Sequence, residues 1–258
     1  MARRIALVLE YEGTAYSGFQ LQRNAPSIQG AVEEAIERMT GAQVRLAGAG
    51  RTDAGVHAIG QVAAFDTDST IVIERFVPGL THFLPDDIAV VQACEVEERF
   101  DPRRDAVARV YRYTFQERRG RSPVRRRLVH QVAGELNVAS MAAVAASLEG
   151  ERDFAPFCGP HPQEKSTVRR MHRAKVWRTE EATGNEVHLE LEANAFLPQQ
   201  VRRVAAAVLE VGQGDMAEEA FLKLVKSGVR GAQERVLPPT GLCLRQVRYG
   251  SCGDDLKG

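Results

Sequence analysis

The chain has 258 residues, and its hydrophobic fraction of 44% and charged fraction of 26% are ordinary for a globular protein with a real core. Its apolar runs fall short of the roughly 18 residues that cross a bilayer, and the run before Glu10 is too short for a signal peptide, so we expect a cytoplasmic protein without membrane association. The net charge is zero and the four cysteines form no Cys-x-x-Cys pair, which predicts neither a bulk attraction to polyanions nor a metal site.

In the first half of the chain, a helix and several strands are predicted in alternation. Ser27 follows Pro26 and opens a helix whose apolar positions recur every three or four residues, from Ile28 to Met39. A helix over 73–84 is also expected, although Pro78 and the glycine after it interrupt the pattern. Alternating or β-branched runs predict strands over 3–11, 44–49, 57–65 and 87–95.

In the second half, strands and helices are predicted in a similar order. Asn137 caps an alanine-rich helix that is expected to stop at Gly150. Pro198 suits the first turn of a helix that runs to about Val211, and a further helix is expected over 216–226. Strands are predicted over 107–116, 173–179, 186–192 and 241–249, and the middle two pair as a hairpin around Gly184.

These elements predict an α+β fold of two similar halves, at about 1–100 and 105–250, joined by a linker over 99–105. Each half is expected to carry an antiparallel or mixed sheet with helices on one face. No short sequence repeat is visible, so any duplication is one of architecture.

Two segments are strongly basic although the whole chain is neutral. From Arg103 to Arg127 there are ten arginines against two acidic residues, a balance of +8, and from Lys165 to Arg178 there are six basic residues and no acid. Such segments give a neutral protein a positive face that suits nucleic acid. An arginine-rich genome explains the same bias equally well, so the charge pattern leaves both readings open.

The segment from Gly48 to His57 has the most unusual composition, because three glycines and two alanines surround Arg51 and Asp53. Small residues allow backbone and ligand to approach closely, and a loop between two strands holds functional groups rigidly. An arginine beside a carboxylate favours its charged form, which suits a nucleophile or an ionised base. The alternative is that Asp53 only caps or turns the chain, and His57 is expected to be structural or hydrogen-bonded.

The run from Arg51 to Ala58 resembles the signature of the TruA family of tRNA pseudouridine synthases. Further runs match that family in order over 3–249, with Phe19 where tryptophan is usual, Ala206 where a glycine is usual, and Pro198-Gln199-Gln200 in place of the commoner residues. The matching runs are Tyr11-Glu12-Gly13-Thr14, Gly18-Phe19-Gln20, Tyr111-Arg112-Tyr113, Phe154 to Cys158 with Ser166 to Arg169, Phe196 with Val201-Arg202, and Pro238 to Leu242.

This resemblance implies the pseudouridine synthase fold, in which the sheets of the two halves join into one central sheet with the catalytic cleft between them. Asp53 is the implied catalytic residue, Tyr111 stacks on the target base, Arg202 holds the aspartate ionised, and Arg51 helps to extrude the base. Tyr111, Arg112 and Arg169 are the implied substrate-binding residues. The implied substrate is uridine at tRNA positions 38–40 in the anticodon stem-loop, and the implied assembly is a homodimer.

The implied reaction gains and loses no atoms, so we expect no cofactor and no metal. Two rival functions remain open from the residues themselves. One is a non-catalytic RNA-binding module, against which the carboxylate of Asp53 argues because it repels phosphate. The other is a hydrolase using Asp53 and His57, which needs a metal or a second catalytic carboxylate that the sequence does not offer convincingly.

Overall fold

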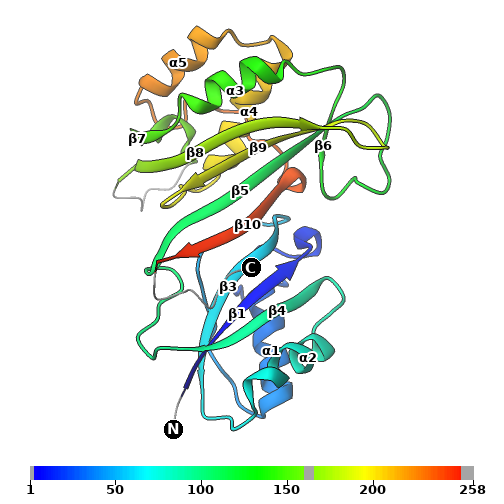
Figure 1. The fold of residues 1–258 in the computed structure, drawn as a ribbon, viewed down its shortest axis with the longest axis vertical. Helices are drawn as coiled ribbons and strands as arrows, with labels where there is room; N and C mark the ends of the chain where they lie inside the picture. The colour runs from blue at the N-terminus through cyan, green and yellow to red at the C-terminus, as the bar shows by residue number, and fades with distance from the viewer. Residues whose placement is uncertain (1–2, 160–165, 251–258) are drawn as a thin grey trace. The chain divides into compact units, whose positions relative to one another are not determined.

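The structure, a computed structural model, describes residues 3–159 and 166–250, and these residues contain ten strands and five α-helices (Figure 1). Strand pairs are both antiparallel and parallel, and helices occur in both halves, so the predicted α+β class with mixed strand pairing is confirmed. The chain divides into two compact units. Unit 1 contains residues 1–109 and 243–258, and unit 2 contains residues 110–242.

The division differs in two respects from the predicted halves at 1–100 and 105–250. The last strand, β10 (Leu242–Tyr249), lies almost wholly in unit 1, where it pairs in parallel with β3 (His57–Thr67). Residues 99–105, predicted as the linker, also belong to unit 1. Sequence order alone does not reveal a strand that returns to the first unit.

Unit 1 is built on β1 (Arg3–Tyr11), which pairs antiparallel with β3 on one side and with β4 (Ile88–Val96) on the other. The short β2 (Ala47–Gly48) pairs with β3, which gives the order β4-β1-β3-β10 in this unit. The helices α1 (Ile28–Thr40) and α2 (Phe76–Phe83) lie beside each other along these strands (Figure 1). Their apolar side chains complete a core with the strand residues Ile5, Leu7 and Phe65.

The predicted elements of unit 1 are largely confirmed. The strand over 3–11 and the Ser27-capped helix are present as predicted, with the Ser27 hydroxyl accepting the N–H of Gly30. The strand expected over 44–49 is reduced to two residues. Pro78 does not break α2, because it lies in the first turn, where the backbone N–H has no partner within the helix.

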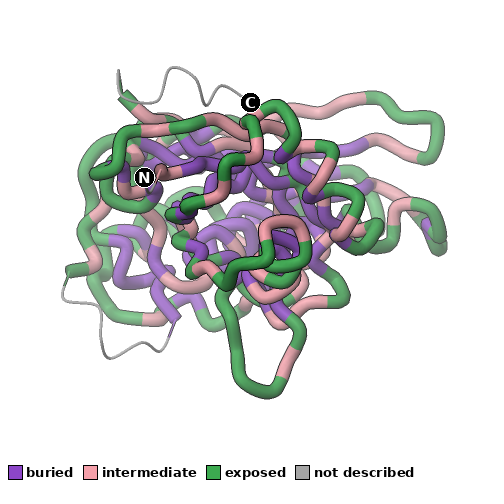
Figure 2. The backbone as a smooth tube through the Cα atoms, turned by 90° about the horizontal axis from the view of Figure 1, so that it is seen from below, coloured by how far each residue is buried: buried purple, intermediate pink, exposed green. Residues whose placement is uncertain are grey.

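Unit 2 contains β5 (Ala106–Glu117) from its fifth residue onward, together with β9 (Glu186–Ala193), β8 (Val168–Thr179) and β7 (Gly150–Asp153), and these strands follow one another in that order. The β8–β9 hairpin pairs antiparallel, as predicted, and β6 (His130–Val132) pairs in parallel with β5. The helices of this unit are α3 (Val138–Ala146), α4 (Gln200–Gln213) and α5 (Glu218–Lys226). The strands β5 and β9 and the helix α4 are largely buried, and Figure 2 shows buried stretches of the backbone inside and exposed stretches in protruding loops.

Two helix ends in unit 2 were predicted wrongly. Helix α3 stops at Ala146, before Gly150, whose φ of +97° instead begins β7. Pro198 lies before α4 rather than in its first turn, because Gln199 with φ +59° is the N-cap. In both places a backbone in the left-handed region ends or begins the element.

Candidate active site

The loop that carries Asp53 connects β2 to β3 and is fixed by main-chain hydrogen bonds. The N–H of Phe19 donates to the carbonyl of Thr52 at 3.1 Å, and the N–H of Ala49 donates to a β3 carbonyl at 2.8 Å. The N–H of Val56 donates to the carbonyl of Asp53 at 3.1 Å. The turn is therefore closed by main-chain groups, and the Asp53 side chain belongs to an exposed residue.

Two glycines of the N-terminal motif pack directly against this loop. A Cβ atom on Gly13 would lie 2.0 Å from the carbonyl oxygen of Val56, and one on Gly18 would lie 2.6 Å from that of Thr52. Gly18 also has a φ of +101°, which side-chain-bearing residues rarely adopt. The N-terminal motif thus forms the surface on which the Asp53 loop rests.

Buried polar side chains support the loop from below. The hydroxyls of Tyr11 and Thr52 lie 2.9 Å apart, and the amide of Gln61 donates to the carbonyl of Gly50 at 2.9 Å. Burial raises the pKa of Tyr11 well above its ordinary value, so its phenol stays protonated. Sequence reasoning missed Gln61, since a glutamine within an apolar strand gives no local signal of its partner.

His57 is held as part of this support. Its ring is buried, and its Nδ1 accepts the N–H of Gly13 at 3.1 Å, with a carboxylate oxygen of Glu12 at 3.7 Å. An acceptor at Nδ1 places the ring proton of the neutral imidazole on Nε2. This arrangement ties the start of β3 to the N-terminal motif.

Tyr111 lies in unit 2 on β5, where it is 9% exposed and stands edge-on to Phe196 with ring centroids 5.2 Å apart. This contact brings together two runs that are distant in sequence, the Tyr111 run on β5 and the Phe196 run before α4. An edge-to-face pair fixes the orientation of both rings.

Arg202 lies in the first turn of α4, and its Nε donates to the carbonyl of Leu237 at 2.7 Å. The start of the helix is held by a reciprocal pair, in which the N–H of Leu197 donates to the Gln200 side chain at 2.7 Å and the N–H of Gln200 donates to the Leu197 carbonyl at 3.1 Å. The unusual Gln200 therefore supplies the contact that orders this turn. Ala206 is completely buried in the same helix.

Arg112 and Arg169 have contacts that serve the fold of unit 2. Arg112 donates through Nε and Nη2 to one oxygen of Glu190, at 3.2 and 2.8 Å, and lies over the ring of Trp177. As the next residue along a strand, it faces the side of the sheet opposite Tyr111. Arg169 donates to the carbonyls of Ser166 and Val168.

The basic segments are less positive than the sequence count indicated. Several of their arginines are paired with carboxylates distant in sequence or are buried among carbonyls: Arg109 with three carbonyls, Arg125 with Glu186, Arg173 with Glu190 and Glu192, and Arg178 with Glu117 and Glu135. Lys165, where the second segment begins, lies outside the described residues. The exposed arginines that remain are the better candidates for contact with a polyanion.

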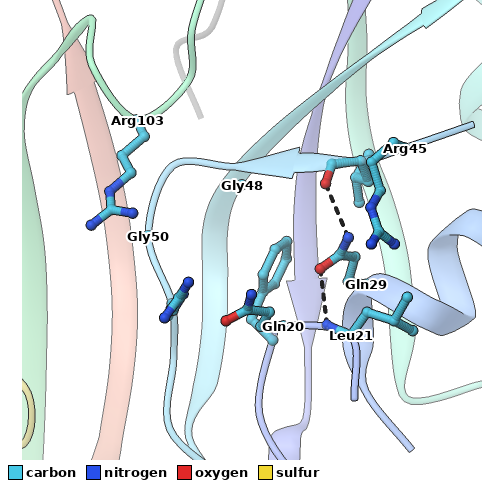
Figure 3. A pocket seen from close by; sticks show the side chains of 10 residues that line it. Gln20, Leu21, Gln29, Arg45, Gly48, Gly50 and Arg103 are labelled. Carbon is cyan, nitrogen blue, oxygen red and sulfur yellow. Dashed lines mark hydrogen bonds between the residues drawn. The ribbon is translucent and has the colours of Figure 1, made fainter. Parts of the chain in front are cut away.

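One pocket of about 240 Å³ in unit 1 opens beside the Asp53 loop (Figure 3). Its wall includes Arg51 together with residues that sequence reasoning did not assign to a site. These are Phe19, Gln20, Leu21, Gln29, Arg45, Leu46, Gly48, Gly50 and Arg103. The motif around Gly18 contained a signal for Phe19 and Gln20, whereas Arg45 carried none.

The predicted site residues thus form two groups, with Arg51 and Asp53 on unit 1 and Tyr111, Arg112, Arg169 and Arg202 on unit 2. Over 3–159 and 166–250, no helix is long and apolar enough to span a membrane. Within the same ranges, no group of three or more histidine, cysteine, aspartate or glutamate side chains is arranged to hold a metal ion.

Comparison with known proteins identifies the family. A family model described as tRNA pseudouridine synthase matches residues 7–103 and 144–250, which include the Asp53 loop and α4. The chain belongs to this family. The tRNA pseudouridine synthase A of Myxococcus xanthus is 44% identical over 95% of this chain and 92% of its own length. That of Geotalea daltonii is 42% identical over 96% of this chain and the whole of its own length.

The predicted family and the predicted isomerase class are therefore confirmed for this pseudouridine synthase. Among solved structures, the archaeal box H/ACA sRNP Nop10–Cbf5 complex is similar over 81% of this chain and 44% of that one. The identity there is 12% and the TM-score is 0.37.

Proposed function

We propose that this protein converts uridine to pseudouridine in the anticodon stem-loop of tRNA, at positions 38–40, with Asp53 as the catalytic carboxylate. The observation that carries the proposal is the exposed Asp53 on a loop whose main chain is fixed on both sides. A carboxylate that stays accessible while its backbone is immobile meets the geometric demand on a nucleophile or base. Relatives that are named tRNA pseudouridine synthase A support tRNA as the substrate.

The chemistry requires one bond to break and another to form within the same nucleotide. The N1–C1′ bond of uridine is cleaved, the base rotates, and C5 bonds to C1′. The proton on C5 is then lost and N1 gains a proton, so the product is an isomer of the substrate. The Asp53 carboxylate serves this path either by adding to the sugar or by removing a sugar proton to give a glycal.

The reaction also needs the uridine to leave its stack, which costs a few kcal/mol. Arg51, two residues before Asp53 and exposed, is proposed to assist that extrusion. Tyr111 and Arg202 are proposed as catalytic residues of unit 2, since the motifs that contain them match the family. The proposed contacts of Arg112 and Arg169 with RNA, the homodimer and the cytoplasmic location stay predictions.

The direct test uses tRNA that carries tritium at uridine C5. The enzyme releases the label to water when C5 bonds to the sugar, whereas a protein that only binds RNA releases none. Mapping pseudouridine before and after treatment then gives the positions. Absence of release from any uridine of an unmodified tRNA pool would contradict the proposal, and release confined to other positions would contradict its anticodon-loop part.

A further inference from the structure

The pocket beside Arg51 carries two further arginines, Arg45 and Arg103, to which the proposed function gives no role. Arg45, Arg51 and Arg103 line it from three places in the sequence, and all three residues are exposed. Figure 3 labels Arg45 and Arg103 among the lining side chains. A pocket whose wall carries several cationic side chains attracts an anion electrostatically. The pocket therefore has the character of an anion site.

The charges of this pocket are only partly neutralised by the protein itself. Glu33 is the acidic partner of Arg45, with 3.4 Å between a guanidinium nitrogen and a carboxylate oxygen. The other Glu33 oxygen already accepts the N–H of Leu46 and an amide hydrogen of Gln29. Across the described ranges, the guanidinium groups of Arg51 and Arg103 have no hydrogen bond or ion pair, so the pocket keeps a positive balance.

The walls that carry Arg51 and Arg103 are tied together by a buried side chain. Arg109, only 9% exposed, donates from one nitrogen to the carbonyls of Ala49 and Arg103, at 3.0 and 2.6 Å. Its other terminal nitrogen donates to the carbonyl of Ala106 at 3.0 Å. A single planar guanidinium thus fixes the spacing between the loop before Arg51 and the loop of Arg103.

The loop of Arg103 is also ordered from its other side. One carboxylate oxygen of Asp101 accepts the backbone N–H groups of Arg103 and Arg104, at 2.8 and 3.0 Å. The Tyr249 hydroxyl donates to the carbonyl of Pro102 at 2.7 Å. The main chain of this loop is therefore already ordered, and only the side chain of Arg103 has to be immobilised when it binds an anion.

We propose that this pocket binds one phosphodiester group of the RNA strand, with Arg103 as its charged ligand beside Arg51. The ligand is a backbone phosphate because guanidinium forks match its oxygens, and a pocket of about 240 Å³ accommodates such a group with part of its sugar. This inference rests on the proposed function, since the phosphate belongs to the substrate RNA. It assigns Arg103 and the clamp residue Arg109 roles that the catalytic proposal lacks.

The test combines arginine variants with an RNA in which one phosphate at a time is a neutral methylphosphonate. Affinity of the full-length protein for an anticodon stem-loop RNA is measured by fluorescence anisotropy at fixed salt. Arg103→Gln should weaken binding on the order of three- to tenfold. It should also reduce the slope of log affinity against log salt concentration by about one, the amount expected for one lost phosphate contact. One methylphosphonate position should weaken the wild type by a similar factor and leave Arg103→Gln unaffected, because both changes remove the same contact.

Arg104→Gln is the matched control, since it removes the same charge from the neighbouring residue, whose guanidinium pairs with Asp101 at 3.6 Å instead of lining the pocket. It should keep full sensitivity to every methylphosphonate. The inference is overturned if no position couples to Arg103, or if Arg104 couples equally. Tritium release by the wild type on the same RNA separates the phosphate site from the catalytic proposal. Release without coupling between Arg103 and any methylphosphonate refutes the phosphate site alone. Coupling without release refutes only the catalytic proposal.

Discussion

Replacing Gly18 by alanine should damage unit 1 and the Asp53 loop together. Gly18 has a φ of +101°, and an added Cβ would lie 2.6 Å from the carbonyl oxygen of Thr52 and 3.3 Å from the carbonyl carbon of Asp53. The backbone conformation costs about 1–3 kcal/mol for a residue with a side chain. The overlap costs about 1–3 kcal/mol more, because these neighbours are main-chain atoms that move only with the loop.

Two other glycines separate these contributions. Gly41 also has a positive φ, +76°, but an added Cβ meets nothing within 4 Å, so Gly41→Ala should show the backbone cost alone. At Gly50 an added Cβ likewise meets nothing within 4 Å and φ is not positive, so Gly50→Ala should leave stability nearly unchanged. The expected order of destabilisation is therefore Gly18, then Gly41, then Gly50.

The assay must report on unit 1 separately. The single tryptophan, Trp177, lies in unit 2, so tryptophan fluorescence follows the wrong unit. Hydrogen exchange of the β1 and β3 amides, followed by mass spectrometry, reports the opening free energy of unit 1 directly. If Gly18→Ala were no less stable there than Gly41→Ala, the claim that the N-terminal motif supports the Asp53 loop would be refuted.

Three further changes test the packing around the two groups of site residues. Arg109→Gln should destabilise unit 1 by about 2–3 kcal/mol, because buried carbonyls lose their donor, and it should speed hydrogen exchange around Arg103; unchanged exchange there would contradict the clamp. Partial burial acts to raise the pKa of Asp101, but hydrogen bonds from two backbone N–H groups and nearby arginine charges outweigh it, and the pKa is lowered. The contribution of Asp101 to folding stability is therefore complete above the unfolded pKa, near 4, and is lost as pH falls through the lower folded pKa. Thermal melts at acid pH should show this loss of stability in the wild type and not in Asp101→Asn. Tyr113→Phe should lower the free energy of unfolding by about 1 kcal/mol, because the phenol donates to the Pro238 carbonyl at 2.9 Å. Urea unfolding followed by Trp177 fluorescence should show a lower midpoint, and an unchanged midpoint would contradict this role of the hydroxyl.

Most elements of the fold were predictable because their signals are local. The alternation over 3–11 and the Ser27 cap each depend on neighbouring residues, and both elements appear as predicted. The errors arose where the end of an element depends on backbone conformation. Gly150 is predicted to end a helix but begins the strand β7. Gln199 has a positive φ and is the N-cap of α4, so the helix begins after Pro198.

The candidate site was predictable to a smaller extent. Asp53 is a candidate that the sequence offers, because its glycine-rich surroundings are visible there, and its catalytic role stays a prediction. The charge count failed for a physical reason, since Glu186 and Glu190 lie far along the chain from the arginines that they neutralise. The pocket beside Arg51 was not predictable, because only the folded chain brings residues such as Arg103 to the loop of Arg51.

The most direct test of the account is single-turnover tritium release by Asp53→Asn. The substitution keeps the shape of an exposed side chain, so stability and tRNA affinity should stay close to those of the wild type. The account predicts that release falls on the order of 10³-fold or more, because amide replaces the catalytic carboxylate. Asp68→Asn, at another exposed aspartate of unit 1, should release tritium at the wild-type rate. Near-normal release by Asp53→Asn would contradict the assignment of Asp53.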